Sequence, residues 1–235
     1  MNSDTSALSA RNASGYPYAV DAPTLADSAQ VSRVLRNTYA LLAMTLLFSA
    51  AVASASVAYQ WRAPGMILTL VGYFGLLFAI HKFQNSAWAL PAVFTLTGFM
   101  GYTLGPLLTH SLALPGGAQT VSMALGATGA TFIGLSAYVL LTRRDFSFIG
   151  GFLFCGMVIA VLAGIAAMLL DIPALGLAVS GMVALLSAGL ILFETSRIVN
   201  GGETNYVMAT VGLFVSVFNL FTSLLSLFGI CGSNE

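Results

Sequence analysis

Charged residues are scarce in this sequence. Only 7% of its 235 residues are Asp, Glu, Lys or Arg, against about a quarter in soluble proteins, while 58% are hydrophobic. The formal net charge is zero, and the sequence has no basic patch with interleaved aromatic residues that would bind nucleic acid. The composition therefore excludes an ordinary soluble domain and predicts an integral membrane protein.

Cysteine and histidine are also rare, with two of each. Cys155 and Cys231 are expected on opposite sides of the bilayer, too far apart for a disulfide, which needs α-carbons within about 7 Å. We therefore expect free thiols. His81 and His110 are expected in loops on opposite sides, where they cannot share a metal ion, so we expect no tight metal site.

Sequence signatures of intramembrane enzymes are absent as well. There is no HExxH helix for zinc and no GxSxG nucleophile turn. No histidine lies inside a predicted membrane helix to activate a serine, and no pair of aspartates lies on facing helices. We therefore expect a protein that is not an enzyme and that uses no cofactor.

The few charges that are present divide the chain into apolar intervals. Each interval fits one membrane helix of about 20 residues, except the interval between Lys82 and Arg143, which fits two. This spacing predicts an all-α integral membrane protein with a bundle of seven transmembrane helices. The expected spans are residues 38–59, 64–80, 87–109, 119–142, 146–170, 173–196 and 206–230.

Basic residues determine the expected orientation. If the N-terminus is cytoplasmic, only Arg62 lies outside and all other basic residues lie inside, which is the bias that the positive-inside rule describes. The C-terminus is then on the outer side. The residues expected inside are Arg11, Arg33, Arg36, Lys82, Arg143, Arg144 and Arg197.

The residues before the first span have a different composition. Residues 1–29 are rich in Ala, Ser, Asn and Asp, and they lack the basic region and short apolar core of a cleaved signal peptide. We therefore expect a flexible cytoplasmic tail over residues 1–31 and a seven-helix transmembrane domain over residues 32–235. The tail is either a solvated end without a role or a handle for a protein partner.

The last predicted helix carries a polar stripe. Ser216, Asn219, Ser223 and Ser226 recur every three or four positions, which places them on one helix face. Hydrocarbon offers no partners to hydroxyl and amide groups, so this face should turn toward the interior of the bundle. The C-terminal helix is therefore predicted to be the central helix.

Glu194 is the one carboxylate that a predicted helix carries toward the membrane core, and it has two interpretations. Arg197 follows three residues later on the same face, so the two could form an interfacial ion pair that ends the sixth helix. Alternatively, Glu194 faces the polar stripe of the seventh helix, where it acts as a proton-sensitive gate or a cation ligand. The sequence leaves both interpretations open.

The third predicted helix contains the segment TGFMGYTLGPLL. Gly101 and Gly105 form a GxxxG step that allows another backbone to approach closely. Pro106 removes a helix hydrogen bond and frees a carbonyl near the outer surface. This carbonyl either lines a cavity or marks no more than an end or a kink of the helix.

Four blocks of the sequence resemble the Bax inhibitor-1 family, most closely its bacterial YccA branch. The blocks are VLRNTYALLAMTL, TGFMGYTLGP, SAYVLLTRRDFSFIGG and LFETSRIVNGGETNY, and the similarity runs from about Ser32 to the end of the chain. The resemblance implies a seven-helix bundle with a central last helix in the bacterial inner membrane. The C-terminus is then expected in the periplasm.

The resemblance implies two functions. Members of the YccA branch are associated with the ATP-dependent membrane protease FtsH, as a substrate whose resistance to degradation makes it a modulator. That role would use the N-terminal tail. Members of the wider family are proton-regulated calcium leak channels, in which an acidic residue late in the sixth helix pairs with an aspartate in the seventh.

The acidic pair that this leak requires is incomplete in the present sequence. Glu194 matches the first position, whereas Ser216 occupies the second. Calcium takes about six to eight oxygen ligands, so Glu194, Ser216, Asn219 and carbonyls would form only a weak site. Modulation of the protease is therefore the preferred prediction, and a pH-regulated calcium leak near Glu194 is the alternative.

Overall fold

The structure is a computed structural model that describes the backbone of residues 25–232, and the predicted flexibility of residues 1–24 lies outside the described residues. The described chain is α-helical, with one short 3-10 helix, Ser147–Ile149, before α5. The long helices are α1 Leu25–Ala58, α2 Met66–Phe83, α3 Ala89–Ala113, α4 Gly117–Thr142, α5 Gly150–Leu169, α6 Pro173–Val199 and α7 Tyr206–Gly232.

All seven helices are long and apolar enough to cross a membrane. The prediction of an all-α integral membrane protein with seven transmembrane helices is therefore confirmed. Most helix ends lie within a few residues of the predicted ones, which is the usual uncertainty of such boundaries.

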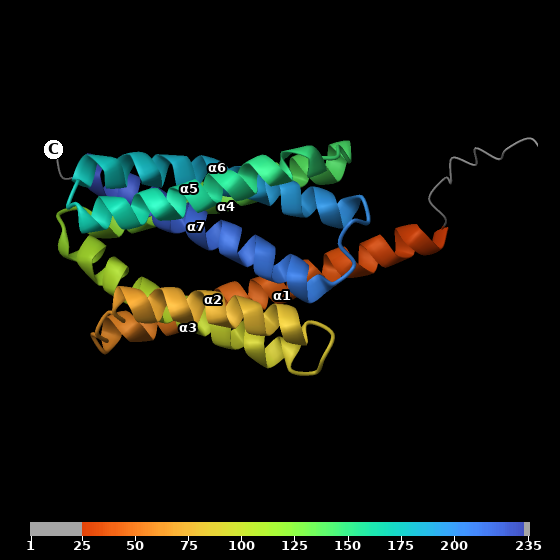
Figure 1. The fold of residues 1–235 in the computed structure, drawn as a ribbon, viewed down its shortest axis with the longest axis horizontal. Coiled ribbons are helices and arrows are strands. Elements are labelled where there is room, and N and C mark those ends of the chain that lie inside the picture. The colour runs from red at the N-terminus through yellow and green to blue at the C-terminus, as the bar shows by residue number, and fades with distance from the viewer. Residues whose placement is uncertain (1–24, 233–235) are drawn as a thin grey trace, which may run out of the picture.

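The start of α1 is the main correction to the predicted spans. The helix begins at Leu25 instead of residue 38, so residues 25–31, which were assigned to the tail, are helical. Packing of α1 on the main core begins with Val34, which is buried, and Leu35, which packs against the same core. With 34 residues, α1 is about 50 Å long, against about 30 Å of hydrocarbon, and its first turns extend past the other helices (Figure 1).

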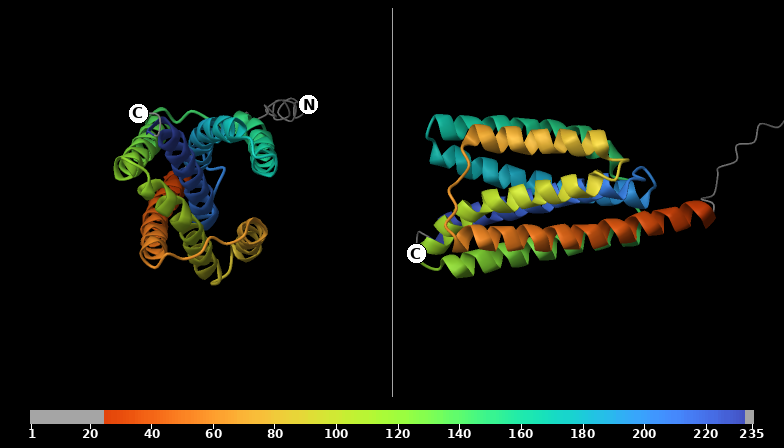
Figure 2. Two further views of the ribbon diagram at one scale, coloured as in Figure 1. Left: turned by 90° about the vertical axis from the view of Figure 1, so that its left-hand side faces the viewer. Right: turned by 90° about the horizontal axis from the view of Figure 1, so that it is seen from below.

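The C-terminal helix α7 occupies the centre of the bundle, as predicted. It packs against α1, α3, α4 and α6, and half of its membrane span is buried, the largest share among the seven spans. Helices α1 to α3 lie on one side of α7 and helices α4 to α6 on the other (Figure 1), and the view along the bundle shows α7 between them (Figure 2, left).

One end of the bundle collects most of the basic residues. The start of α1 and the loops α2–α3, α4–α5 and α6–α7 lie at this end, on the right in Figure 1. Of the basic residues in the described chain, only Arg62 lies at the opposite end. We call it the basic end, and the positive-inside rule predicts that it is cytoplasmic. Its basic residues are Arg33, Arg36, Lys82, Arg143, Arg144 and Arg197.

Candidate functional site at the basic end

Glu194 belongs to α6, lies about one and a half turns before the end of this helix at Val199, and faces α7. A methyl group added to Gly212 of α7 would lie 2.8 Å from the carboxyl carbon of Glu194, so the absence of a side chain at Gly212 makes room for the carboxylate. The Glu194 side chain is 15% exposed. The structure therefore places Glu194 against the seventh helix, as the gate interpretation requires.

Arg197 joins Glu194 to a second carboxylate. Its Nη2 donates a hydrogen bond of 3.0 Å to Oε2 of Glu203, and its Nη1 lies 3.7 Å from Oε2 of Glu194. The predicted ion pair between Glu194 and Arg197 is thus present, but the closer partner of Arg197 is Glu203. We call Glu194, Arg197 and Glu203 the charge cluster.

The sequence analysis missed Glu203, which lies beyond the end of α6. The chain reverses at Gly201, whose φ of 75° is a left-handed conformation that favours glycine, and the Glu203 amide then donates to the Arg197 carbonyl at 3.1 Å. The Asn-Gly-Gly segment directly after the helix was the available signal, because glycine after a helix end typically turns the chain back.

The polar stripe of α7 faces the interior, but it does not complete the charge cluster. Ser216 is buried and donates a hydrogen bond to the Gly212 carbonyl at 2.9 Å, one turn along the helix. Ser223 is also buried, and Asn219 is partly buried. Within residues 29–229, no hydrogen bond or ion pair joins these three side chains to Glu194, so Ser216 does not act as a substitute for the missing acid.

Further hydroxyl groups line the interior beside the charge cluster. The Ser136 and Thr195 hydroxyls, on α4 and α6, lie 3.5 Å apart and are buried. Thr210 of α7 donates to the carbonyls of Tyr206 at 2.7 Å and of Thr38 at 3.3 Å. The Thr38 hydroxyl is itself buried without a hydrogen-bond partner in the described part of the chain. The interior at this level can therefore offer oxygen atoms to a proton or a cation.

The proposed cavity at Gly105 and Pro106 is corrected by the structure. Helix α3 continues through Pro106 to Ala113, and the carbonyl that Pro106 frees, at Tyr102, accepts a hydrogen bond of 3.3 Å from the Ser56 hydroxyl of α1. Gly105 lies directly against the same Ser56 side chain. Hydroxyl side chains often satisfy such carbonyls in membrane helices, and here one fills the space.

Asp145, in the α4–α5 loop, connects this loop to the end of α6 through hydrogen bonds. Its Oδ1 accepts hydrogen bonds from the Ser147 amide at 2.8 Å and from the Ser196 hydroxyl at 3.5 Å. The Ser196 hydroxyl in turn accepts from the Phe146 amide at 2.8 Å. These hydrogen bonds, that from Ser147 foremost, hold the pKa of Asp145 below its ordinary value of 3.8.

Asn205 fastens the α2–α3 loop to the start of α7. Its Oδ1 accepts from the amides of Val207 at 2.9 Å and Met208 at 3.4 Å, which caps the helix. Its Nδ2 donates to the Gln84 carbonyl at 3.2 Å and to Oδ1 of Asn85 at 3.3 Å. The two fastened loops hold the ends of α6 and α7, and with them the charge cluster, in place.

The charge cluster contains carboxylates that can bind a proton, but it has too few ligands to retain a metal ion. With both carboxylates ionised its formal charge is −1, and protonation of one carboxylate makes it neutral. Among the described residues, no group of three or more His, Cys, Asp or Glu side chains lies close enough to hold a metal ion. A cation at this site would thus have fewer ligands than calcium prefers.

Comparison with known proteins identifies the family. Residues 31–233 match the sequence profile described as "Inhibitor of apoptosis-promoting Bax1". The chain is 50% identical over 197 residues to the Escherichia coli K12 protein named "Modulator of FtsH protease YccA", covering 84% of this chain and 90% of that protein. It is 47% identical over 211 residues to an uncharacterised protein of Pseudomonas aeruginosa, covering 90% and 95% of the two chains.

A membrane protein of Vibrio cholerae is a third relative. It is 42% identical over 207 residues, which cover 88% of this chain and 93% of the relative. The family match over residues 31–233 reaches all seven helices. The chain therefore belongs to the Bax inhibitor-1 family.

Proposed function

We propose that this protein is a modulator and a substrate of an FtsH-type protease in the bacterial inner membrane. The observation that carries the proposal is the 50% identity to the E. coli modulator over 90% of that protein's length. The family match over residues 31–233 also reaches all seven helices and the loops between them. The role is one of binding and slow degradation, without a catalytic site of its own.

The shape of the bundle supports this role. The first turns of α1 project from the basic end (Figure 1), which is the predicted cytoplasmic side, so a protease on that side would meet this end of α1. Pulling on this end acts first on α1, which packs against α3 and the central helix α7. Because α7 contacts four helices, extraction of α1 disturbs the whole bundle, and a substrate that resists extraction occupies the protease for longer.

The experiment replaces residues 2–24 with a Gly/Ser segment of equal length, which leaves α1 intact. The variant should insert normally and have a longer half-life than the wild type in cells that contain FtsH. In cells without FtsH the two half-lives should be equal. Overproduced wild type should also slow the degradation of a second FtsH substrate. If the half-lives of wild type and variant are equal in both strains, the protease does not engage the protein through residues 2–24. If overproduction does not slow the degradation of the second substrate, the protein is not a modulator.

A second candidate function is a pH-regulated cation leak near Glu194. The observation that favours it is the position of Glu194 against Gly212 of the central helix, at a level where buried hydroxyl groups face the interior. Purified protein in liposomes should then pass calcium with a rate that changes between pH 5 and 8. Glu194→Gln should remove the pH dependence, and Ser216→Asp should strengthen it, because two nearby carboxylates titrate as a coupled pair. A wild type that passes no calcium at any pH excludes this candidate.

A further inference from the structure

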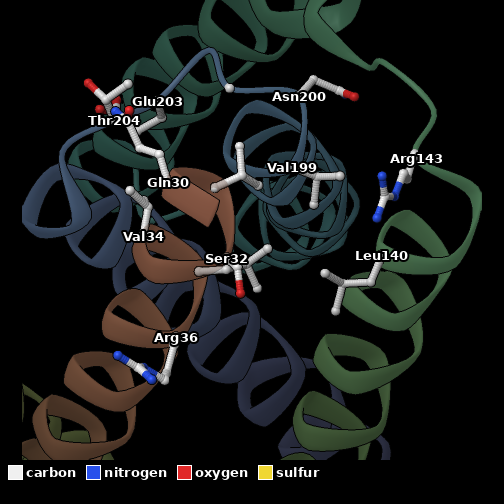
Figure 3. Close-up of a pocket in the computed structure, with 13 residues that line it drawn as sticks. Gln30, Ser32, Val34, Arg36, Leu140, Arg143, Val199, Asn200, Glu203 and Thr204 are labelled. Carbon is white, nitrogen blue, oxygen red and sulfur yellow. The ribbon is translucent and has the colours of Figure 1, made fainter. Parts of the chain in front are cut away.

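A large pocket opens at the basic end, between α1 and α4. Its volume is about 1000 Å³, and its walls come from the first turns of α1, the last turns of α4 and the turn after α6 (Figure 3). Farther along the two helices, the ring of Tyr39 on α1 and the ring of Phe132 on α4 meet, with centroids 6.0 Å apart. We call the pocket at the basic end the recess.

Two arginines from different helices line this recess. Arg36 belongs to α1, and Arg143 follows the last residue of α4 and extends toward the pocket from the opposite wall (Figure 3). Both residues are exposed, and no ion pair within the described part of the chain uses either of them. An arginine presents a planar set of donors that matches a phosphate group in geometry and charge.

The acidic residue of the lining does not neutralise these arginines. Glu203 lines the recess, but its Oε2 accepts a hydrogen bond of 3.0 Å from Arg197 and its Oε1 accepts one of 2.9 Å from the Asn205 amide. Glu203 thus directs both oxygens to partners other than Arg36 and Arg143, and the two arginines outnumber the single carboxylate of the lining. Asn200 adds an amide to the same rim.

Part of the remaining lining is polar and part is apolar. Gln30, Ser32 and Thr204 are polar, and the apolar part consists of Val31, Val34, Leu35, Leu140 and Val199. Leu140 is 38% exposed. A free anion such as inorganic phosphate makes no favourable contact with the apolar side chains. A molecule with a charged head group and hydrocarbon chains can contact both the arginines and the apolar side chains of the lining. The recess also lies at the depth where lipid head groups meet the acyl chains.

We propose that this recess is a binding site for one anionic phospholipid, with its phosphate group at Arg143 and the start of its acyl chains against Leu140 and Val199. The exposed Arg36 side chain, which is turned away from Arg143 in the structure (Figure 3), would swing in from the opposite wall to contact the same phosphate. Basic pockets between membrane helices on the cytoplasmic side commonly take anionic head groups. The lipid would bridge α1 and α4, which belong to the two helix groups on either side of α7. The inference does not depend on the proposed relation to the protease.

The test measures lipid retention by native mass spectrometry of the full-length protein released from detergent. Phosphatidylglycerol and phosphatidylcholine, with equal acyl chains, compete at equal concentration. The wild type should retain phosphatidylglycerol in preference, and the double variant Arg36→Gln/Arg143→Gln should lose roughly 30-fold in this preference, about fivefold for each arginine. The matched control Arg33→Gln/Arg144→Gln removes the same charge from the same helix ends outside the recess and should stay within about twofold of the wild type.

Three outcomes would overturn the proposal. The first is equal retention of the two lipids by the wild type. The second is an equal loss in the control variant, which would assign the preference to the general charge of the surface. The third is displacement of the lipid by inorganic phosphate at equal concentration, which would make the recess a site for a free anion. If the double variant does not fold, Arg143→Gln alone, at an exposed helix end, should still lose about fivefold.

Discussion

Replacing the members of the charge cluster one at a time should rank their contributions to stability as Arg197 first, Glu203 second and Glu194 last. The ranking follows from the two distances that Arg197 makes, 3.0 Å to Glu203 and 3.7 Å to Glu194. Only the shorter one is within the range of a hydrogen bond. Glu194 and Glu203 are about equally buried, but Arg197 compensates the negative charge of Glu194 less well.

The magnitudes can be set from these contacts. Glu203→Gln weakens a charge-assisted hydrogen bond and should lower the free energy of unfolding by about 2 kcal/mol. Glu194→Gln removes an ion pair without good hydrogen-bond geometry and should cost less than about 1 kcal/mol. Arg197→Gln leaves two carboxylates, 15% and 16% exposed, without a cation, and should cost about 3 kcal/mol.

The assay is unfolding of the purified protein in mixed micelles by titration with sodium dodecyl sulfate at pH 7.5, followed by far-ultraviolet circular dichroism. Arg62→Gln is the control, since it removes one charge at the opposite end of the bundle and should change the free energy of unfolding by no more than about 0.5 kcal/mol. Double-variant cycles should give a larger coupling energy between Arg197 and Glu203 than between Arg197 and Glu194.

A cost for Glu194→Gln equal to or above that for Glu203→Gln would refute this reasoning. Glu194 would then be the structural partner of Arg197, and the helix-end ion pair would be a sufficient account of it. A low cost, in contrast, would show that stability does not require a charge at this position. The carboxylate would then be available for the proton-sensitive role considered above.

Three further predictions concern orientation, packing and acid stability. Reporter fusions should place the N-terminus in the cytoplasm and the C-terminus in the periplasm, because the basic end should face inward; a cytoplasmic C-terminus would contradict the topology. Gly101→Ala should destabilise by about 1–3 kcal/mol, since an added Cβ would press on the Ser49 backbone, whereas Gly126→Ala, with open space around it, should cost nothing in the same assay. In the folded protein the pKa of Asp145 is below its unfolded value, so its contribution to the free energy of unfolding should be full above about pH 4 and be lost as the pH falls further. Asp145→Asn should flatten the plot of unfolding free energy against pH in this acidic range. An unchanged plot would contradict the role of the hydrogen bonds to Asp145.

The sequence by itself determined the number of helices and the central place of the last one. A membrane span needs about 20 apolar residues, so the few charges mark the helix ends along the chain. The stripe that includes Ser216 and Ser223 turned inward because hydrocarbon cannot satisfy hydroxyl groups. For Glu194 the sequence left two interpretations open, and only the packing of α6 on α7 placed its carboxylate against Gly212.

Only the tertiary structure decided which groups meet across the bundle. The Ser56 hydroxyl satisfies the carbonyl that Pro106 frees, 46 residues away from it in the chain, and this pairing depends on how closely α1 and α3 pack. Glu203 reaches Arg197 because the turn at Gly201 returns the chain to the helix end. The recess that Arg36 and Arg143 line is formed by α1, α4 and the turn after α6, which are far apart in the chain. Each of these contacts depends on the relative placement of whole helices, which local composition and spacing do not encode.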